Sequence, residues 1–96
     1  MQKRIKIPNE VSLQIESLQY EYNSRKDLIA YMISNDYSTT SDAFKAYQKE
    51  YIEFYTKYNM AKEELENSIL RPQIEGKMTG WNLTFATSEV IVDYED

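Results

Sequence analysis

Two long stretches of the chain repeat apolar residues in steps of three and four, the spacing of one face of an α-helix. In the first stretch, residues 9–35, the repeat consists of Val11, Ile15, Leu18, Tyr22, Ile29 and Met32, with Arg25 at the one polar position. In the second, residues 41–71, it consists of Phe44, Tyr47, Tyr51, Phe54, Tyr58, Ala61 and Leu65. Pro72 sets the expected end of the second helix, because the residue before a proline avoids helical geometry. The pattern predicts two long helices with a coiled-coil-like seam.

A short polar segment, NDYSTTSD at residues 35–42, separates the two predicted helices. It is rich in turn-forming residues, and Thr40 or Ser41 is expected to cap the start of the second helix. Two helices of equal length joined by a short loop predict an antiparallel helical hairpin.

Alternating apolar and polar residues predict a strand at residues 1–7 and a β-hairpin at residues 80–95. We expect Ile5 and Ile7 to share one core with Trp81, Leu83, Val90 and Val92, and the basic first strand to lie beside the acidic last strand. An antiparallel helical hairpin returns the chain to its start. The expected fold is therefore α+β, a single domain of residues 1–96 in the order β-α-α-β-β, with a small three-stranded antiparallel sheet at one end of a long helical hairpin.

Composition narrows the chemistry that so small a domain can carry. The 96 residues include no cysteine and no histidine, which excludes disulfides, thiolate or imidazole zinc sites, and Ser-His or Cys-His nucleophiles. The run Glu63, Glu64 and Glu66 is interpreted as a solvated helix face. We expect no catalytic residue, metal, cofactor or small-molecule substrate. No apolar run is long enough for a membrane span or a signal peptide, so we expect a soluble, unsecreted protein in the cytoplasm or a virion.

A net charge of −5 argues against a general nucleic-acid-binding protein. The abundance of lysine, asparagine, isoleucine and tyrosine suggests an AT-rich genome, and a small protein without a recognisable active site fits a phage or mobile-element virion component. A small acidic inhibitor that mimics DNA is a further alternative, although lysines are interspersed among the acidic residues.

The first helix carries a second apolar stripe on the side opposite its seam, formed by Leu13, Tyr20, Leu28 and Tyr31. The aromatic stripe of the second helix is expected to pack against the first helix as core. A two-helix hairpin buries only one face of each helix, so the second stripe predicts a surface for another copy of this chain or for another protein. The leading expectation is a non-enzymatic assembly protein that acts as an oligomer.

Residues 3–33, KRIKIPNEVSLQIESLQYEYNSRKDLIAYMI, resemble a ribbon-helix-helix repressor, in which a basic strand and a proline precede two helices. The resemblance implies that Arg4 and Lys6 contact the major groove from a dimeric ribbon, and that Asn23-Ser24 forms the turn between the helices. The alternative function is therefore a DNA-binding transcriptional regulator. The two interpretations differ at Asn23-Ser24, where the apolar repeat of the first helix continues in phase.

Overall fold

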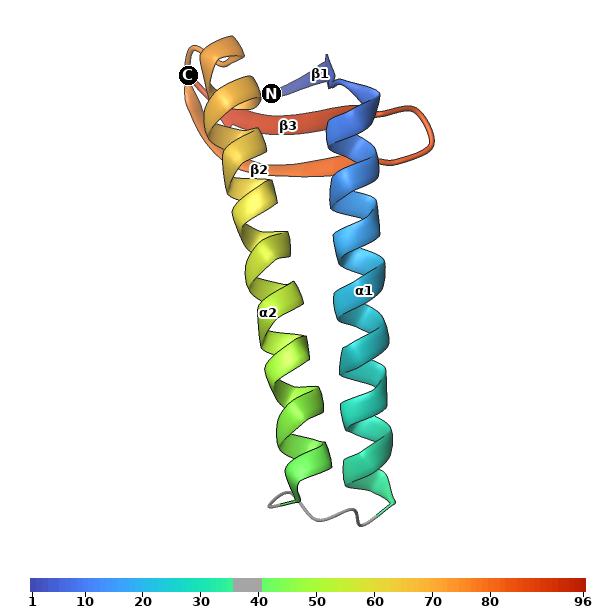
Figure 1. The fold of residues 1–96 in the computed structure, drawn as a ribbon. Coiled ribbons are helices and arrows are strands. Elements are labelled where there is room, and N and C mark those ends of the chain that lie inside the picture. The colour runs from blue at the N-terminus through green and yellow to red at the C-terminus, as the bar shows by residue number, and fades with distance from the viewer. Residues whose placement is uncertain (36–40) are drawn as a thin grey trace. The chain divides into compact units, whose positions relative to one another are not determined.

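The structure is a computed structural model that describes residues 1–35 and 41–96 (Figure 1). In chain order its elements are β1 (Gln2–Lys6), α1 (Asn9–Ser34), α2 (Asp42–Leu65), a π-helical turn η1 (Glu66–Leu70), a 3-10 turn η2 (Arg71–Gln73), β2 (Lys77–Thr84) and β3 (Glu89–Glu95). The predicted α+β fold, with two long helices and a three-stranded antiparallel sheet in the order β-α-α-β-β, is confirmed.

Helix α1 runs without a break through Asn23-Ser24. The turn that the ribbon-helix-helix resemblance implied at this point is therefore wrong. The physical reason is the apolar repeat itself, which stays in phase on both sides of Asn23 and so favours one helix over two.

The chain divides into two compact units. The sheet unit comprises Met1–Glu16 and Met60–Asp96, and so contains all three strands, the start of α1 and the end of α2. The hairpin unit comprises Ser17–Asn59, in which the rest of α1 and α2 run antiparallel (Figure 1).

The sheet has the strand order β1-β3-β2, which places β3 in the centre. Ile5 of β1 and Leu83 of β2 both lie opposite Val90 of β3, and Trp81 lies opposite Val92. Residues that face each other across strands point to the same side of a sheet. Ile5, Ile7, Val90 and Val92 are all buried. The structure thus confirms the expected core of the sheet, with Trp81 and Leu83 only partly buried.

The basic strand β1 pairs with the acidic strand β3, as the sequence predicted, and one hydrogen bond and one ion pair join their side chains. The Gln2 amide donates to the Asp93 carboxylate at 2.9 Å, and the Arg4 guanidinium lies 3.8 Å from the Glu89 carboxylate. These contacts are exposed, so each contributes less than about 1 kcal/mol. Their main effect is on register, because a shift by one residue would separate the charges and turn Ile5 away from the core.

The end of α2 differs from its expected form. The α-helix ends at Leu65 rather than near Arg71, and the chain continues through the wider turn η1, where the Arg71 N–H bonds to the Glu66 carbonyl. Proline has no N–H, and its ring clashes with the carbonyl four residues earlier in a regular α-helix. A π-helical turn just before Pro72 is consistent with the chain relieving that clash.

One side-chain cap sets the start of α2, and strand pairing sets the start of β2. The Ser41 hydroxyl accepts the Phe44 N–H at 3.1 Å and caps α2, whereas Thr40, the alternative cap, lies outside the described residues. Strand β2 begins at Lys77, three residues before the predicted start, because Lys77 pairs with Glu95 near the end of β3. A β-bulge between Met78 and Gly80 interrupts this longer pairing.

We predict that Gly76→Ala destabilises the protein. A Cβ atom at Gly76 would collide with the backbone carbonyl of Glu95, so β3 would have to move away. Overpacking of this kind costs about 1 to 3 kcal/mol, which thermal unfolding followed by circular dichroism can measure. Gly80→Ala is the matched control, because nothing lies within 4 Å of its added Cβ. Equal melting temperatures for the two variants would contradict the prediction.

Candidate protein-interaction surface

The two units bury their apolar side chains very differently. Among the described residues, seven apolar side chains are buried in the sheet unit but only two, Met32 and Phe44, in the hairpin unit. Large apolar side chains that remain exposed show the opposite distribution, with three in the sheet unit and seven in the hairpin unit. The seven are Tyr20, Leu28, Tyr31, Ile33, Tyr47, Ile52 and Tyr55. The hairpin unit therefore leaves a large apolar surface open to solvent.

The stripe predicted on α1 is exposed at every position. Leu13, in the sheet unit, is 63% exposed, and in the hairpin unit Tyr20, Leu28 and Tyr31 are 70%, 37% and 59% exposed. Tyr20 and Tyr31 are eleven residues apart, which is about three helical turns, so both point to one side of α1. We call Tyr20, Leu28 and Tyr31 the outer stripe. Its role in binding stays a prediction.

A cluster of tyrosines forms the seam of the hairpin unit. The Tyr22 ring of α1 lies 6.3, 5.6 and 5.0 Å from the ring centroids of Tyr51, Tyr55 and Tyr58 of α2. Tyr51 and Tyr55 also stack on each other. The aromatic stripe of α2 thus meets α1 as expected, but Tyr47 and Tyr55 remain 38% and 44% exposed. One partner helix covers only one side of a stripe this broad.

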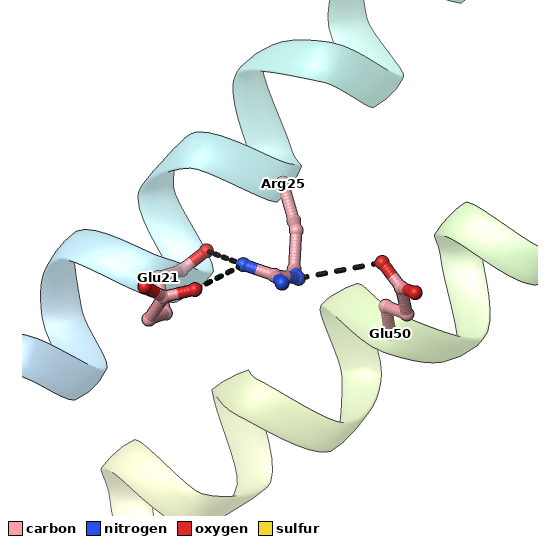
Figure 2. A network of polar contacts seen from close by, with 3 residues as sticks. All are labelled: Glu21, Arg25 and Glu50. Atoms are coloured by element: carbon pink, nitrogen blue, oxygen red, sulfur yellow. Dashed lines mark hydrogen bonds and ion pairs between the residues drawn. The ribbon is translucent and has the colours of Figure 1, made fainter.

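On one side of the seam lies a cluster of charged groups (Figure 2). Arg25 of α1 donates to the side-chain and backbone oxygens of Glu21, and its Nε lies 3.5 Å from the Glu50 carboxylate of α2. The same guanidinium lies 4.1 Å from the centroid of the Phe54 ring. We call Glu21, Arg25, Glu50 and Phe54 the charged flank. Arg25, the polar interruption in the predicted seam, thus has partners on both helices.

On another part of the hairpin unit's surface, a shallow groove of about 270 Å³ runs between the helices. Its lining residues are Lys26, Ile29, Ala30, Ile33, Gln48 and Tyr51. Lys26 is the one charged residue among them. Ile52 and Tyr55 continue this surface along α2, since they lie four and seven residues after Gln48. We call the groove together with Ile52 and Tyr55 the apolar flank.

The apolar flank does not follow from the repeat of apolar residues along either helix. The available signal was the pair Ile33 and Ile52, two large apolar residues that the seam pattern leaves unassigned. The groove was hard to recognise from the sequence, because two of its lining residues, Gln48 and Lys26, are polar.

The alternative DNA-contacting residues, Arg4 and Lys6, have partners within the chain. Arg4 pairs with Glu89, and the Lys6 ammonium donates to the Thr87 carbonyl. Strand β1, which would form an intermolecular ribbon in a ribbon-helix-helix dimer, pairs with β3 of the same chain. Arg4 is thus paired with the acidic strand β3, and Lys6 with the turn that precedes it.

The structure brings together few groups with metal-binding chemistry. Within residues 1–35 and 41–96, no three histidine, cysteine or acidic side chains are placed to hold a metal ion. Glu66 of the predicted acidic helix face forms an ion pair with Arg71 at 3.6 Å. No helix in this described part of the chain is both long and apolar enough to cross a membrane.

Comparisons with models of protein families, with curated proteins and with solved structures gave no match. The function must therefore be argued from the chain's own surfaces.

Burial raises the pKa of Tyr58 above the 10.0 of a free tyrosine. The folded protein then holds the phenol proton more tightly than the unfolded chain does. The contribution of the neutral Tyr58 side chain to the free energy of unfolding is therefore present below about pH 10, and it is lost as the pH rises through the folded pKa. We expect the melting temperature to fall less steeply above about pH 9 in Tyr58→Phe than in the wild type. Tyr20→Phe controls for the removal of one hydroxyl. Equally steep curves for Tyr58→Phe and the wild type would contradict the prediction.

Proposed function

We propose that this chain is a non-enzymatic assembly protein that binds other protein chains through its hairpin unit. The observation that carries the proposal is the burial pattern of that unit, with two buried apolar side chains and seven large ones exposed. Monomeric soluble proteins rarely expose large apolar patches, and such patches commonly mark sites of protein association.

A two-helix hairpin has a small core and therefore little apolar burial to stabilise it. Burial of apolar surface stabilises by about 25 cal/mol per Å², and helices in proteins depend on such packing for most of their stability. Tyrosines suit an interface, because the ring supplies apolar area and the hydroxyl can reach water or a polar partner. Association would give the exposed rings of Tyr20 and Tyr31 the cover that α2 does not provide.

The burial pattern supports assembly over the two alternatives. A ribbon-helix-helix repressor needs a turn between its two helices at Asn23-Ser24, whereas α1 is continuous there. A DNA-mimicking inhibitor needs ordered rows of acidic groups, and the hairpin unit instead mixes Lys45, Lys49, Glu50 and Glu53 along α2. A virion or mobile-element setting stays a prediction from composition.

The proposal predicts that the purified protein self-associates. Its weight-average mass, measured by light scattering between about 1 and 100 µM, should rise well above the chain mass of 11.4 kDa. Tyr20→Ser with Tyr31→Ser should lower the mass at the upper concentrations, because the change removes two exposed rings of the outer stripe. Lys45→Ser with Lys49→Ser is the control at exposed polar positions of α2.

A wild-type protein that stays at 11.4 kDa throughout this range would contradict self-association. Assembly that is unchanged in the tyrosine variant would show that the outer stripe takes no part in it.

A further inference from the structure

The two flanks of the hairpin unit differ in what burial would cost. Burying the charged flank would desolvate Glu21, Arg25 and Glu50 together, and the desolvation of an ion cluster commonly exceeds its Coulombic gain. The apolar flank carries one charge, Lys26, whose aliphatic stem can lie along the interface while its ammonium reaches water. The apolar flank is therefore the one that another chain can cover at little cost.

The apolar flank also has ridges and a groove, the surface shape through which helices pack against one another. Ile33 and Ile52 are each 54% exposed, whereas the groove beside Ile33 is lined by the small side chain of Ala30. Large exposed side chains beside a small one give the ridges and grooves through which helices pack. Tyr55 adds an aromatic edge held in place by Tyr22 and Tyr51.

We propose that the apolar flank binds the apolar flank of a second copy of this chain, so that two hairpin units form an intermolecular four-helix arrangement. This inference rests on the proposed function and names the partner and the surface. A two-fold contact uses the same patch on both copies, so the ridges Ile33 and Ile52 of each chain enter the groove of the other. Four helices enclose a core that two helices cannot.

The size of the flank fits a dimer. Each helical segment of the hairpin unit is about 27 Å long and each helix about 10 Å wide, which gives a flat face on the order of 500 Å². The accessible surface of a ridged face exceeds its flat area, and a stable interface buries about 800 Å² on each partner. A single helix from another protein would fill the groove but would leave Ile52 and Tyr55 partly uncovered, whereas a second hairpin covers both helices.

The test removes the outer stripe first, so that the apolar flank is examined alone. In the Tyr20→Ser, Tyr31→Ser background, sedimentation equilibrium should give a dimer with micromolar or tighter dissociation. Adding Ile33→Lys and Ile52→Lys should weaken dimerisation at least tenfold, because four lysines would then face each other at the two-fold contact. Ala43→Lys with Ala46→Lys adds the same charge at exposed positions on the side of α2 away from Gln48 and Ile52, and should leave the dimer intact.

A second measurement does not depend on the lysine variants folding. The chain has no cysteine, so a single cysteine introduced at Gln48 or Ile52 reports only its own contacts. At least one of these two variants should form a disulfide-linked dimer on mild oxidation, faster than Ala46→Cys does, because Ala46 lies on the side of α2 away from the groove.

The outcomes separate this inference from the proposed function. A dimer that survives Ile33→Lys with Ile52→Lys, together with no preferential cross-linking at residues 48 and 52, would overturn the inference and leave assembly through another surface. A wild-type monomer at every concentration would overturn the inference and also the self-association on which it rests.

Discussion

Two antiparallel helices can cover only one face of each other, and this limit shapes both halves of the molecule. In the hairpin unit the seam is filled by Tyr22 and its three partners on α2, yet only Met32 and Phe44 become buried there. Among the described residues of the unit, seven other large apolar side chains remain exposed. The result is a long hairpin with ordered rings and little enclosed volume.

In the sheet unit, the three-stranded sheet forms a second layer in addition to the helices, so more than one face of the helices can be covered. Strands from both ends of the chain meet in one sheet, and Val90 and Val92 of its central strand are completely buried. Ile15 of α1 and Leu65 of α2 are buried in the same unit. A sheet packed on helices thus completes a core within one chain, which is what the hairpin unit lacks and what a second copy would supply.

Periodicity made the fold predictable, since repeats of three and four define α1 and α2 and alternation defines β1 and β3. Features that depend on contacts between residues distant in sequence were harder to predict. The early start of β2 depends on pairing Lys77 with Glu95, and the left-handed backbone of Ser88 (φ 52°) belongs to a turn whose carbonyl accepts the Ile7 N–H.

The candidate site was predicted only in part, for a related reason. The outer stripe follows from spacing on one helix, so the exposure of Tyr20 and Tyr31 could be anticipated. The apolar flank is made by two helices, and its position depends on how each is rotated about the seam. A rotation of a few tens of degrees decides whether Ala30 or Arg25 stands beside the groove, and the repeat alone does not fix rotation that closely.

The most direct test of the account is the concentration dependence of the wild-type melting temperature. If dimerisation completes the core of the hairpin unit, unfolding is coupled to dissociation, and a roughly hundredfold rise in concentration should raise the melting temperature by about 5 to 10 °C. A melting temperature that stays constant over that range would show that one chain folds to full stability alone, and would contradict the account.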